Sequence, residues 1–186
     1  MALRLGLRYN LLLVDDLKTG RSHEVDPDGL FKTGDCFQVR LRPSRGGRMY
    51  VFNQGSSGAW HALLPSALAP DEPVDVTANQ EVTIARDHCF VLDDRKGVDK
   101  LVIMITDRPE DFRDLDKPQP VKPASETQLA MRIKSLFDSP MALVSRDMAI
   151  QKIGSSPGDP PNSVYVVKKA ASEGDRLSIE ISLRHE

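Results

Sequence analysis

Residues 37–42, with the sequence F-Q-V-R-L-R, carry the clearest indication of the fold. Apolar and polar side chains alternate at all six positions, as they do in a β-strand that buries one face and exposes the other. The turn-forming sequence K-T-G-D at residues 32–35 precedes this stretch, and Pro43 followed by Gly46 and Gly47 ends it. The stretch therefore predicts a half-buried strand with a turn at each end.

Other short segments of the same kind lie on both sides of this strand. Residues 7–14 begin with alternation and end as an apolar run, and residues 101–106 are almost continuously apolar, which is typical of strands inside a sheet. Further candidate strands are residues 49–52, 60–64, 82–84, 88–92, 142–153, 164–167 and 177–183. We predict a mostly β protein, an immunoglobulin-like antiparallel β-sandwich of about seven to nine strands.

One helix and two irregular connections are expected beside the strands. Ser125 and Gln128 fit a helix-capping box, which predicts an amphipathic helix over about residues 126–137. Its apolar face would carry Leu129, Ile133, Leu136 and Phe137. Several prolines predict an exposed internal linker over residues 110–124 and an irregular surface connection over residues 65–80.

The length of the chain is sufficient for one hydrophobic core. It has 186 residues, of which 40% are hydrophobic and 28% charged, and a chain of this size can bury about 70% of its surface. Residues 125–186 would form only a marginal core alone. We therefore expect a single domain over residues 1–186, in which residues 7–109 form the core of the sandwich and residues 125–186 pack back onto it.

Charge and cysteine content argue against several classes of protein. The chain has 25 Lys and Arg against 27 Asp and Glu, a formal charge of -2, so electrostatics give no reason to expect a nucleic acid as the main partner. Residues 11–14, the longest apolar stretch near the N-terminus, are far shorter than the roughly 20 residues that span a bilayer, and nothing resembles the core of a signal peptide. Two cysteines are too few for a disulfide scaffold or a four-cysteine zinc site.

The sequence N-Q-G-S-S-G-A-W at residues 53–60 is the leading candidate for a binding site. Its two glycines can adopt positive φ in a hairpin loop, and polar side chains around one tryptophan can hold a polar ligand or a peptide. The alternative is that Trp60 fills the core while the amides bind loop backbone, and the prominence of large aromatics in small cores favours it. The candidate binding residues are Asn53, Gln54, Ser56, Ser57 and Trp60.

The two serines of this loop also raise the hypothesis of a hydrolase. A histidine such as His61 or His88, oriented by Asp93, can activate a serine hydroxyl if the fold brings them together. However, a nucleophile elbow requires G-x-S-x-G on a strand-to-helix turn, and this loop reads G-S-S-G inside a hairpin. We expect a structural turn and no catalytic residues, with a hydrolase as the alternative.

We expect no metal and no cofactor. The four histidines do not occur at metal-ligand spacings. The aspartates near residues 26–28, 35 and 93–94 can offer oxygen ligands to calcium, but aspartate is also a common turn residue. The chain contains no phosphate-binding loop and no dinucleotide fingerprint.

Cys36 and Cys89 lie on candidate strands with Trp60 between them in sequence, the order found in immunoglobulin domains. However, the alternation of residues 37–42 places Cys36 on the polar face with Gln38 and Arg40. A bridge across the core would require an apolar-face cysteine. We therefore expect two unpaired thiols.

Four arginines cluster on one strand face and the turn that follows it, at Arg40, Arg42, Arg45 and Arg48. They can bind phosphate or an acidic partner, or they can form a solvated strand face that discourages edge pairing. No aromatic residues interleave with them, which argues against nucleic-acid binding.

Residues 7–109 resemble a bacterial family with no assigned activity, domain of unknown function 4384. The resemblance rests on L-R-Y-N-L-L-L (7–13), E-V-D-P-D (24–28), F-K-T-G-D (31–35), the distinctive N-Q-G-S-S-G-x-W (53–60) and F-V-L-D-D (90–94). It implies a β-sandwich-like accessory domain of bacterial proteins that are often exported or found beside signalling domains. It implies no catalytic residues.

The resulting prediction is a non-catalytic binding or protein-interaction module of a bacterial envelope or signalling-associated protein. We expect its partner to be another protein or an envelope component, and the chain to be a monomer or a weak dimer. The resemblance favours an extracytoplasmic location, either the periplasm or the cell surface.

Overall fold

The computed structural model describes residues 4–64, 75–107, 148–153, 163–169 and 176–186. These residues form thirteen strands and no helix, so none of them belongs to a helix that could span a membrane. The strands are β1 (Arg4–Asp16), β2 (Arg21–Val25), β3 (Leu30–Phe31), β4 (Cys36–Pro43), β5 (Gly47–Gln54), β6 (Trp60–Leu64), β7 (Asp75–Val76), β8 (Val82–Ile84), β9 (Phe90–Val91), β10 (Gly97–Thr106), β11 (Met148–Ile153), β12 (Ser163–Lys169) and β13 (Leu177–His185).

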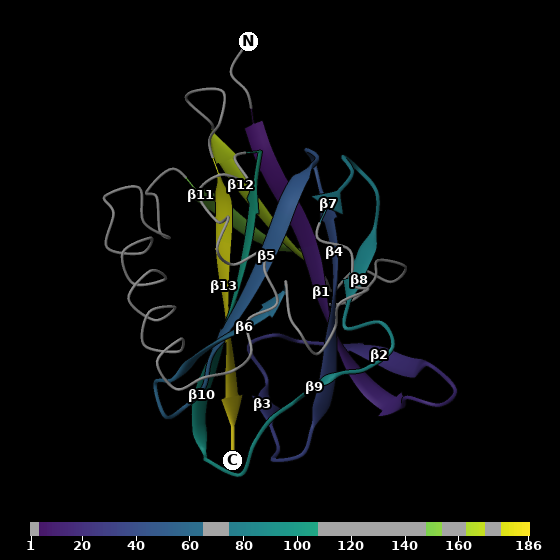
Figure 1. Cartoon of the computed structure of the whole chain (residues 1–186), viewed down its shortest axis with the longest axis vertical. Helices are drawn as coiled ribbons and strands as arrows, with labels where there is room; N and C mark the ends of the chain where they lie inside the picture. Colours follow the sequence, from purple (N-terminus) through teal and green to yellow (C-terminus); the bar gives the residue numbers. More distant parts are fainter. Residues whose placement is uncertain (1–3, 65–74, 108–147, 154–162, 170–175) are drawn as a thin grey trace.

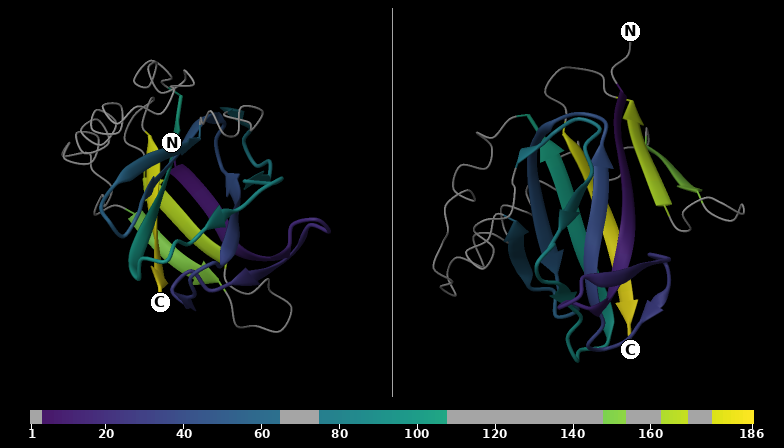
Figure 2. Two further views of the ribbon diagram at one scale, coloured as in Figure 1. Left: turned by 60° about the horizontal axis from the view of Figure 1, so that its bottom comes forward. Right: turned by 90° about the vertical axis from the view of Figure 1, so that its right-hand side faces the viewer.

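The strands form two sheets (Figures 1 and 2). The seven-stranded sheet has the order β11-β12-β1-β4-β8, with β2 also paired to β1 and β9 to β4. The six-stranded sheet has the order β3-β13-β10-β5-β6, with β7 also paired to β5. All pairs are antiparallel except β3 with β13, which run parallel. The last two strands of the chain therefore lie beside earlier ones, β12 against the first strand β1 and β13 against β10.

The core between the sheets follows the predicted alternation. In β4, Phe37, Val39 and Leu41 are only 5%, 0% and 1% exposed, as residues 37–42 predicted. They meet the inward residues of the other long strands, among them Leu11, Val51, Leu101, Ile103 and Ile181. Burial of these apolar faces, at about 25 cal/mol per Å² removed from water, is the main force that holds the sheets together.

The six-stranded sheet is buried on both faces over its middle rows. Tyr50, Phe52, Val102 and Met104 alternate with core residues and point away from the other sheet, yet each is at most 3% exposed. This explains why residues 49–52 and 101–106 read as continuous apolar runs, as expected for strands covered on both sides.

Two expectations differ from the structure. The described residues contain thirteen strands where seven to nine were expected. β2, β3 and β7 were not among the candidates, because β3 and β7 have only two residues each and β2 shows no clear apolar alternation in sequence. The strand β7 also lies within the segment 65–80 that was predicted to be irregular, and it pairs with β5 at Gly47 and Arg48. The predicted helix at 126–137 and the linker at 110–124 lie outside the described residues.

Candidate functional site

The candidate loop is a tight hairpin between β5 and β6. Gln54 pairs with Trp60 across it, the Gly55 amide donates to the Ala59 carbonyl (3.0 Å), and the Gly58 amide donates to the Gly55 carbonyl (2.8 Å). Gly58 has φ of 84°, a conformation that side chains with Cβ rarely adopt. The prediction of a glycine-dependent hairpin turn is confirmed at this position.

A β-bulge decides where Trp60 points. The register between β5 and β6 shifts between Val51 and Phe52, so Leu64 pairs with the core residue Val51 whereas Trp60 pairs with Gln54. Trp60 therefore shares the outer face of the sheet, where it is half-buried, and does not fill the core between the sheets. The interpretation of Trp60 as a core plug is wrong for this reason.

The side chains of the loop are used to hold its shape. The Ser56 hydroxyl donates to the Arg95 carbonyl (3.0 Å), and the Ser57 hydroxyl accepts from the Ala59 amide (3.4 Å). The Gln54 side-chain amide donates to the Gly58 carbonyl (3.2 Å). Such local bonds stabilise turns of this kind.

A buried carboxylate fixes the loop to the rest of the sheet. The Ser56 backbone amide donates to Asp99 Oδ1 over 2.7 Å, and His185 Nε2 lies 3.5 Å from the same oxygen. Asp99 and His185 are 6% and 3% exposed, and His185 Nδ1 has no hydrogen-bond partner within the described part of the chain. The loop is therefore anchored through β10 and β13 as well as through its own strands.

The contact between Asp99 and His185 was not predicted, although the sequence contains a signal for it. Asp99 precedes Leu101, Ile103 and Ile105 at alternate positions, and His185 ends the alternating series of β13. A charged or titratable residue on the apolar side of an alternating strand predicts a buried polar contact.

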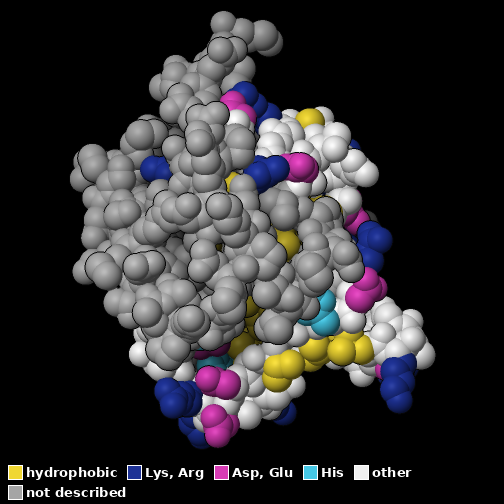
Figure 3. Space-filling model, viewed as in Figure 1, with side chains coloured by type: hydrophobic (Ala, Val, Ile, Leu, Met, Phe, Trp, Pro, Cys, Tyr) yellow, Lys and Arg dark blue, Asp and Glu magenta, His cyan; other side chains and the backbone are white. Residues whose placement is uncertain are grey.

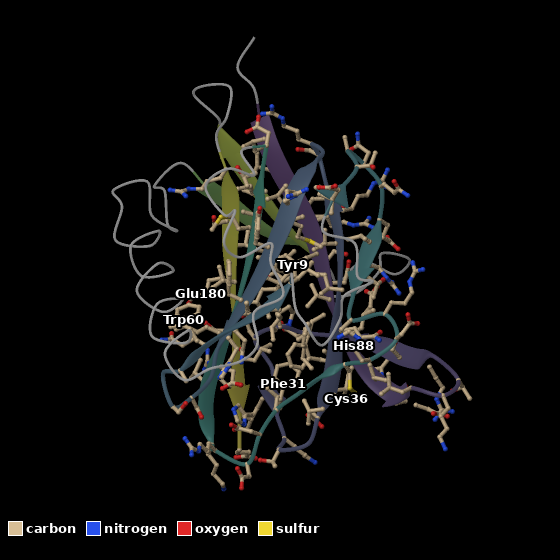
Figure 4. The ribbon with its side chains drawn as sticks, in the orientation of Figure 1. Tyr9, Phe31, Cys36, Trp60, His88 and Glu180 are labelled. Carbon is tan, nitrogen blue, oxygen red and sulfur yellow. A yellow bond between two sulfur atoms is a disulfide. The ribbon has the colours of Figure 1, made fainter. Side chains whose placement is uncertain are left out.

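The outer face next to the loop carries a row of side chains across four strands. Trp60 pairs with Gln54, Gln54 with Lys100, and Lys100 with Ser182, so the four residues share one face. The row spans about 14 Å at the usual spacing between strands. Lys100 Nζ lies 3.3 Å from Glu180 Oε1, and Figure 4 shows Trp60 and Glu180 on the same side of the molecule. Asn53 pairs with Leu101 and His61 on the opposite face, so the five predicted residues do not form one cluster.

Gly97 supplies the space that the anchored loop requires. It has φ of 155°, and a Cβ atom at this position would lie 2.9 Å from Ser56 Cβ. We expect Gly97→Ala to lower the free energy of unfolding by about 1–3 kcal/mol, because it adds both backbone strain and overpacking against Ser56. Urea unfolding measures the change.

Gly58→Ala is the matched control for this substitution. Gly58 also has positive φ, but no atom lies within 4 Å of the position that a Cβ would take there, so only backbone strain of about 1 kcal/mol is expected. Equal effects of the two substitutions would contradict the role assigned to Ser56.

The residues of the hypothetical triad have other contacts. His88 packs edge-on against Phe90 (ring centroids 6.2 Å apart) and lies far from Trp60 in Figure 4. His61 is exposed, and Asp93 accepts a bond from the Arg95 amide (2.9 Å). A cavity at the other end of β5, beside Ser44, Arg45 and Thr106, has a volume of about 10 Å³ and is large enough for a single water.

The aspartates considered as calcium ligands stabilise turns. Asp26, Asp35 and Asp93 accept bonds from backbone amides two or three residues away, as is common for aspartate in turns. No group of three or more His, Cys, Asp or Glu side chains in the described ranges is placed to hold a metal ion.

The expectation of two unpaired thiols is wrong. Cys36 and Cys89 form a disulfide with their Cα atoms 5.5 Å apart. As the alternation of residues 37–42 indicated, Cys36 lies on the outer face of its sheet with Gln38. The bridge joins two neighbouring segments of the same sheet, because β9 begins at residue 90 and pairs with β4. It does not cross the core.

The arginine cluster is occupied by contacts within the chain. Arg40 contacts Glu24 (3.3 Å) and Glu81 (3.5 Å), and Arg42 donates to the Asn79 carbonyl (2.7 Å). Arg45 binds Asp107 (2.6 Å) and Arg48 binds Asp75 (3.2 Å). These contacts favour the interpretation of a solvated strand face over that of a phosphate site.

Comparison with known proteins finds a family model that matches part of the chain. Residues 30–109 match the model of a family described as a domain of unknown function (DUF4384). The match confirms the resemblance over this range, which contains the strands from β3 to β10, the hairpin loop and both cysteines. No curated protein and no solved structure matches the chain.

Proposed function

From the match of residues 30–109 to a domain family without an assigned activity, we propose that the chain is a non-catalytic binding or protein-interaction module. We place it in a bacterial envelope or signalling-associated protein. The observation that carries the proposal is the row of Trp60, Gln54, Lys100 and Ser182 on the outer face, beside a loop that is held in one shape.

The row and the anchored loop suit ligand binding better than catalysis. The Asp99 anchor and the bonds within the loop fix the position of β6 before a partner arrives, which reduces the entropy lost on binding. The row offers an aromatic side chain next to an amide, an ammonium and a hydroxyl group, a combination that contacts the apolar and polar parts of a ligand together. A peptide segment of another protein or an envelope fragment fits this chemistry.

The hydrolase alternative requires a different state of the loop. Asp99 and His185 lie close together, but the loop meets Asp99 through the Ser56 amide, and the Ser56 hydroxyl is bonded to a backbone carbonyl. A serine nucleophile requires a hydrogen bond from its hydroxyl to the imidazole of the histidine that acts as the base. The geometry of Ser56 therefore supports the binding module over the hydrolase.

The disulfide supports an extracytoplasmic location, in the periplasm or at the cell surface, because disulfides persist in oxidising compartments. We assign the two stacked sheets to an immunoglobulin-like sandwich within a single domain, on the basis of their mostly antiparallel pairing. We propose that the module acts as a monomer or a weak dimer.

Trp60→Ala should abolish ligand binding at the row while the fold persists. The measurement is a thermal-shift screen of the protein against soluble cell-wall fragments, sugars, nucleotides, calcium and zinc. A ligand at 100 times its Kd stabilises the native state by about 2.7 kcal/mol, which raises the Tm of a domain of this size by about 5–10 °C. This shift should disappear in Trp60→Ala.

His61→Ala is the matched control, because His61 is the next residue of β6 and points to the opposite face. It should retain the full shift. An equal ligand-induced increase in Tm in the wild type and in Trp60→Ala would show that the row is not part of the binding site. If no ligand raises the Tm of the wild type, pull-down experiments test for protein partners instead.

A further inference from the structure

Residues 85–92, which we call the clamp strip, lie along the outer edge of β4. The strip begins after β8, contains β9 and ends at Leu92. It pairs with β4 through Cys36 with Val91 and Phe37 with Phe90. Within the described ranges, β9 has no other strand neighbour, so the strip forms part of the edge of the seven-stranded sheet (Figure 1).

The first anchor of the clamp strip is the side chain of Gln38. Its Nε2 atom donates to the carbonyls of Ala85 (2.7 Å), Arg86 (3.0 Å) and His88 (2.8 Å). Gln38 is 8% exposed, so these bonds are shielded from water. Because the side-chain amide of Gln38 has two N–H groups for three acceptors, at least one N–H group is shared between two carbonyls.

The second anchor lies at the other end of the clamp strip. The Leu92 amide donates to the Asp35 carbonyl (3.0 Å), and the Gly34 amide donates to the Leu92 carbonyl (2.9 Å). Leu92 itself belongs to the core. The Cys36–Cys89 disulfide lies between the two anchors and is the covalent link of the strip to β4.

The clamp strip closes one edge of the core with apolar side chains. Phe90 packs against the core and against the ring of Phe37, with the centroids 5.5 Å apart. Val91 beside it is 61% exposed, and Figure 3 shows hydrophobic side chains at the surface around β9. Displacement of residues 89–91 would therefore expose further apolar surface and the backbone edge of β4.

We propose that the Cys36–Cys89 disulfide is a redox-sensitive clamp that controls the exposure of this edge. A dithiol reductant breaks the S–S bond, gives two electrons and two protons to form two protein thiols, and itself becomes a disulfide. Residues 89–91 then loosen between the two anchors while the sandwich stays folded. The proposal does not depend on the binding function assigned to the row near Trp60.

The exposure of the two cysteines supports this role. Both are partly exposed, so a thiolate can reach the bridge without unfolding of the core. Exposed disulfides are more readily reduced than those buried in a core, and the labile or regulatory bridges belong to this class. The anchors on both sides confine the change to a short segment, because neither Gln38 nor Leu92 depends on the sulfur atoms for its bonds.

Hydrogen exchange of the full chain, with and without dithiothreitol, tests the clamp. Thiol alkylation and mass measurement establish whether the bridge is reduced. We expect the amides of residues 89–91 to exchange at least ten-fold faster after reduction, with an opening free energy below that of global unfolding, whereas those of residues 101–106 in β10 open only with global unfolding and change by no more than the fall in the free energy of unfolding. The variant C36S/C89S should show the fast rates with or without dithiothreitol.

Gln38→Ala separates the clamp from its anchor. It should speed exchange at residues 85–88 in the oxidised protein, and residues 89–91 should still respond to dithiothreitol. Three results would overturn the proposal. They are a bridge that resists dithiothreitol in the native protein, unchanged rates at residues 89–91 after reduction, and equal acceleration throughout the described strands.

Discussion

The variant C36S/C89S is expected to have a free energy of unfolding about 4 kcal/mol lower than that of the oxidised wild type. The bridge joins residues 53 apart in sequence, and it restricts the unfolded chain far more than the folded one. Urea unfolding measures the difference, and Trp60, the single tryptophan, provides the fluorescence signal.

The reduced wild type is the control for this prediction. It should match C36S/C89S in stability, because both lack the covalent link and differ only at two sulfur atoms. A loss below about 1 kcal/mol would contradict the estimate and indicate that the unfolded chain already holds these segments together. Hydrogen exchange of the same variant in the absence of urea separates this global effect from the local opening of the clamp strip.

The disulfide shows how far alternation along one strand can predict contacts. Residues 37–42 correctly place Phe37, Val39 and Leu41 in the core, and they correctly place Cys36 on the outer face. The prediction of unpaired thiols fails because a bridge can also form within one sheet. Two cysteines on one sheet bond when their Cα atoms lie about 4.4–6.8 Å apart, and here the distance is 5.5 Å. Nothing in the local sequence indicates that residues 89–91 return beside β4.

The candidate site illustrates a second limit. The hairpin and its glycine turn are predictable from residues 53–60, because local backbone requirements select glycine. The face of the sheet on which Trp60 lies is not predictable from these residues, because it depends on a bulge that shifts the register of β6 against β5. Alternation assigns Trp60, Ala62 and Leu64 to one face, and a single extra residue breaks that assignment. The neighbours of Trp60 and Gln54 on distant strands, such as Lys100 and Ser182, are set by the sheet topology, which the local sequence does not indicate.

The anchor of the loop could have been predicted in part. The apolar alternation of β10 and β13 places Asp99 and His185 on inward positions, and buried polar groups require partners. Their mutual contact was not predictable, because it depends on which residues of β10 and β13 stand opposite each other. The register pairs Asp99 with Leu183 and Gly97 with His185, which brings the two side chains to the same end of the sheet.

Asp99→Ala is expected to lower the free energy of unfolding by about 3 kcal/mol. The substitution removes a buried acceptor from the Ser56 amide, which bonds to it over 2.7 Å, and leaves His185 without its polar neighbour. A hydrogen bond to a charged group contributes about 1.5–3 kcal/mol, and a buried donor without a partner adds a cost of similar size. Urea unfolding measures the loss, and hydrogen exchange should accelerate more at residues 55–58 of the loop than in β5.

Two substitutions test whether the carboxylate oxygen itself anchors the loop. Asp99→Asn keeps an oxygen acceptor of the same shape, so it should retain much of the stability and the slow exchange at residues 55–58. Asp93→Ala removes an exposed carboxylate that accepts a hydrogen bond from a nearby turn amide, and it should cost no more than about 1 kcal/mol. If Asp99→Ala proves no more harmful than Asp93→Ala, the loop is held by its own strands, and the preorganisation of the row near Trp60 cannot depend on Asp99.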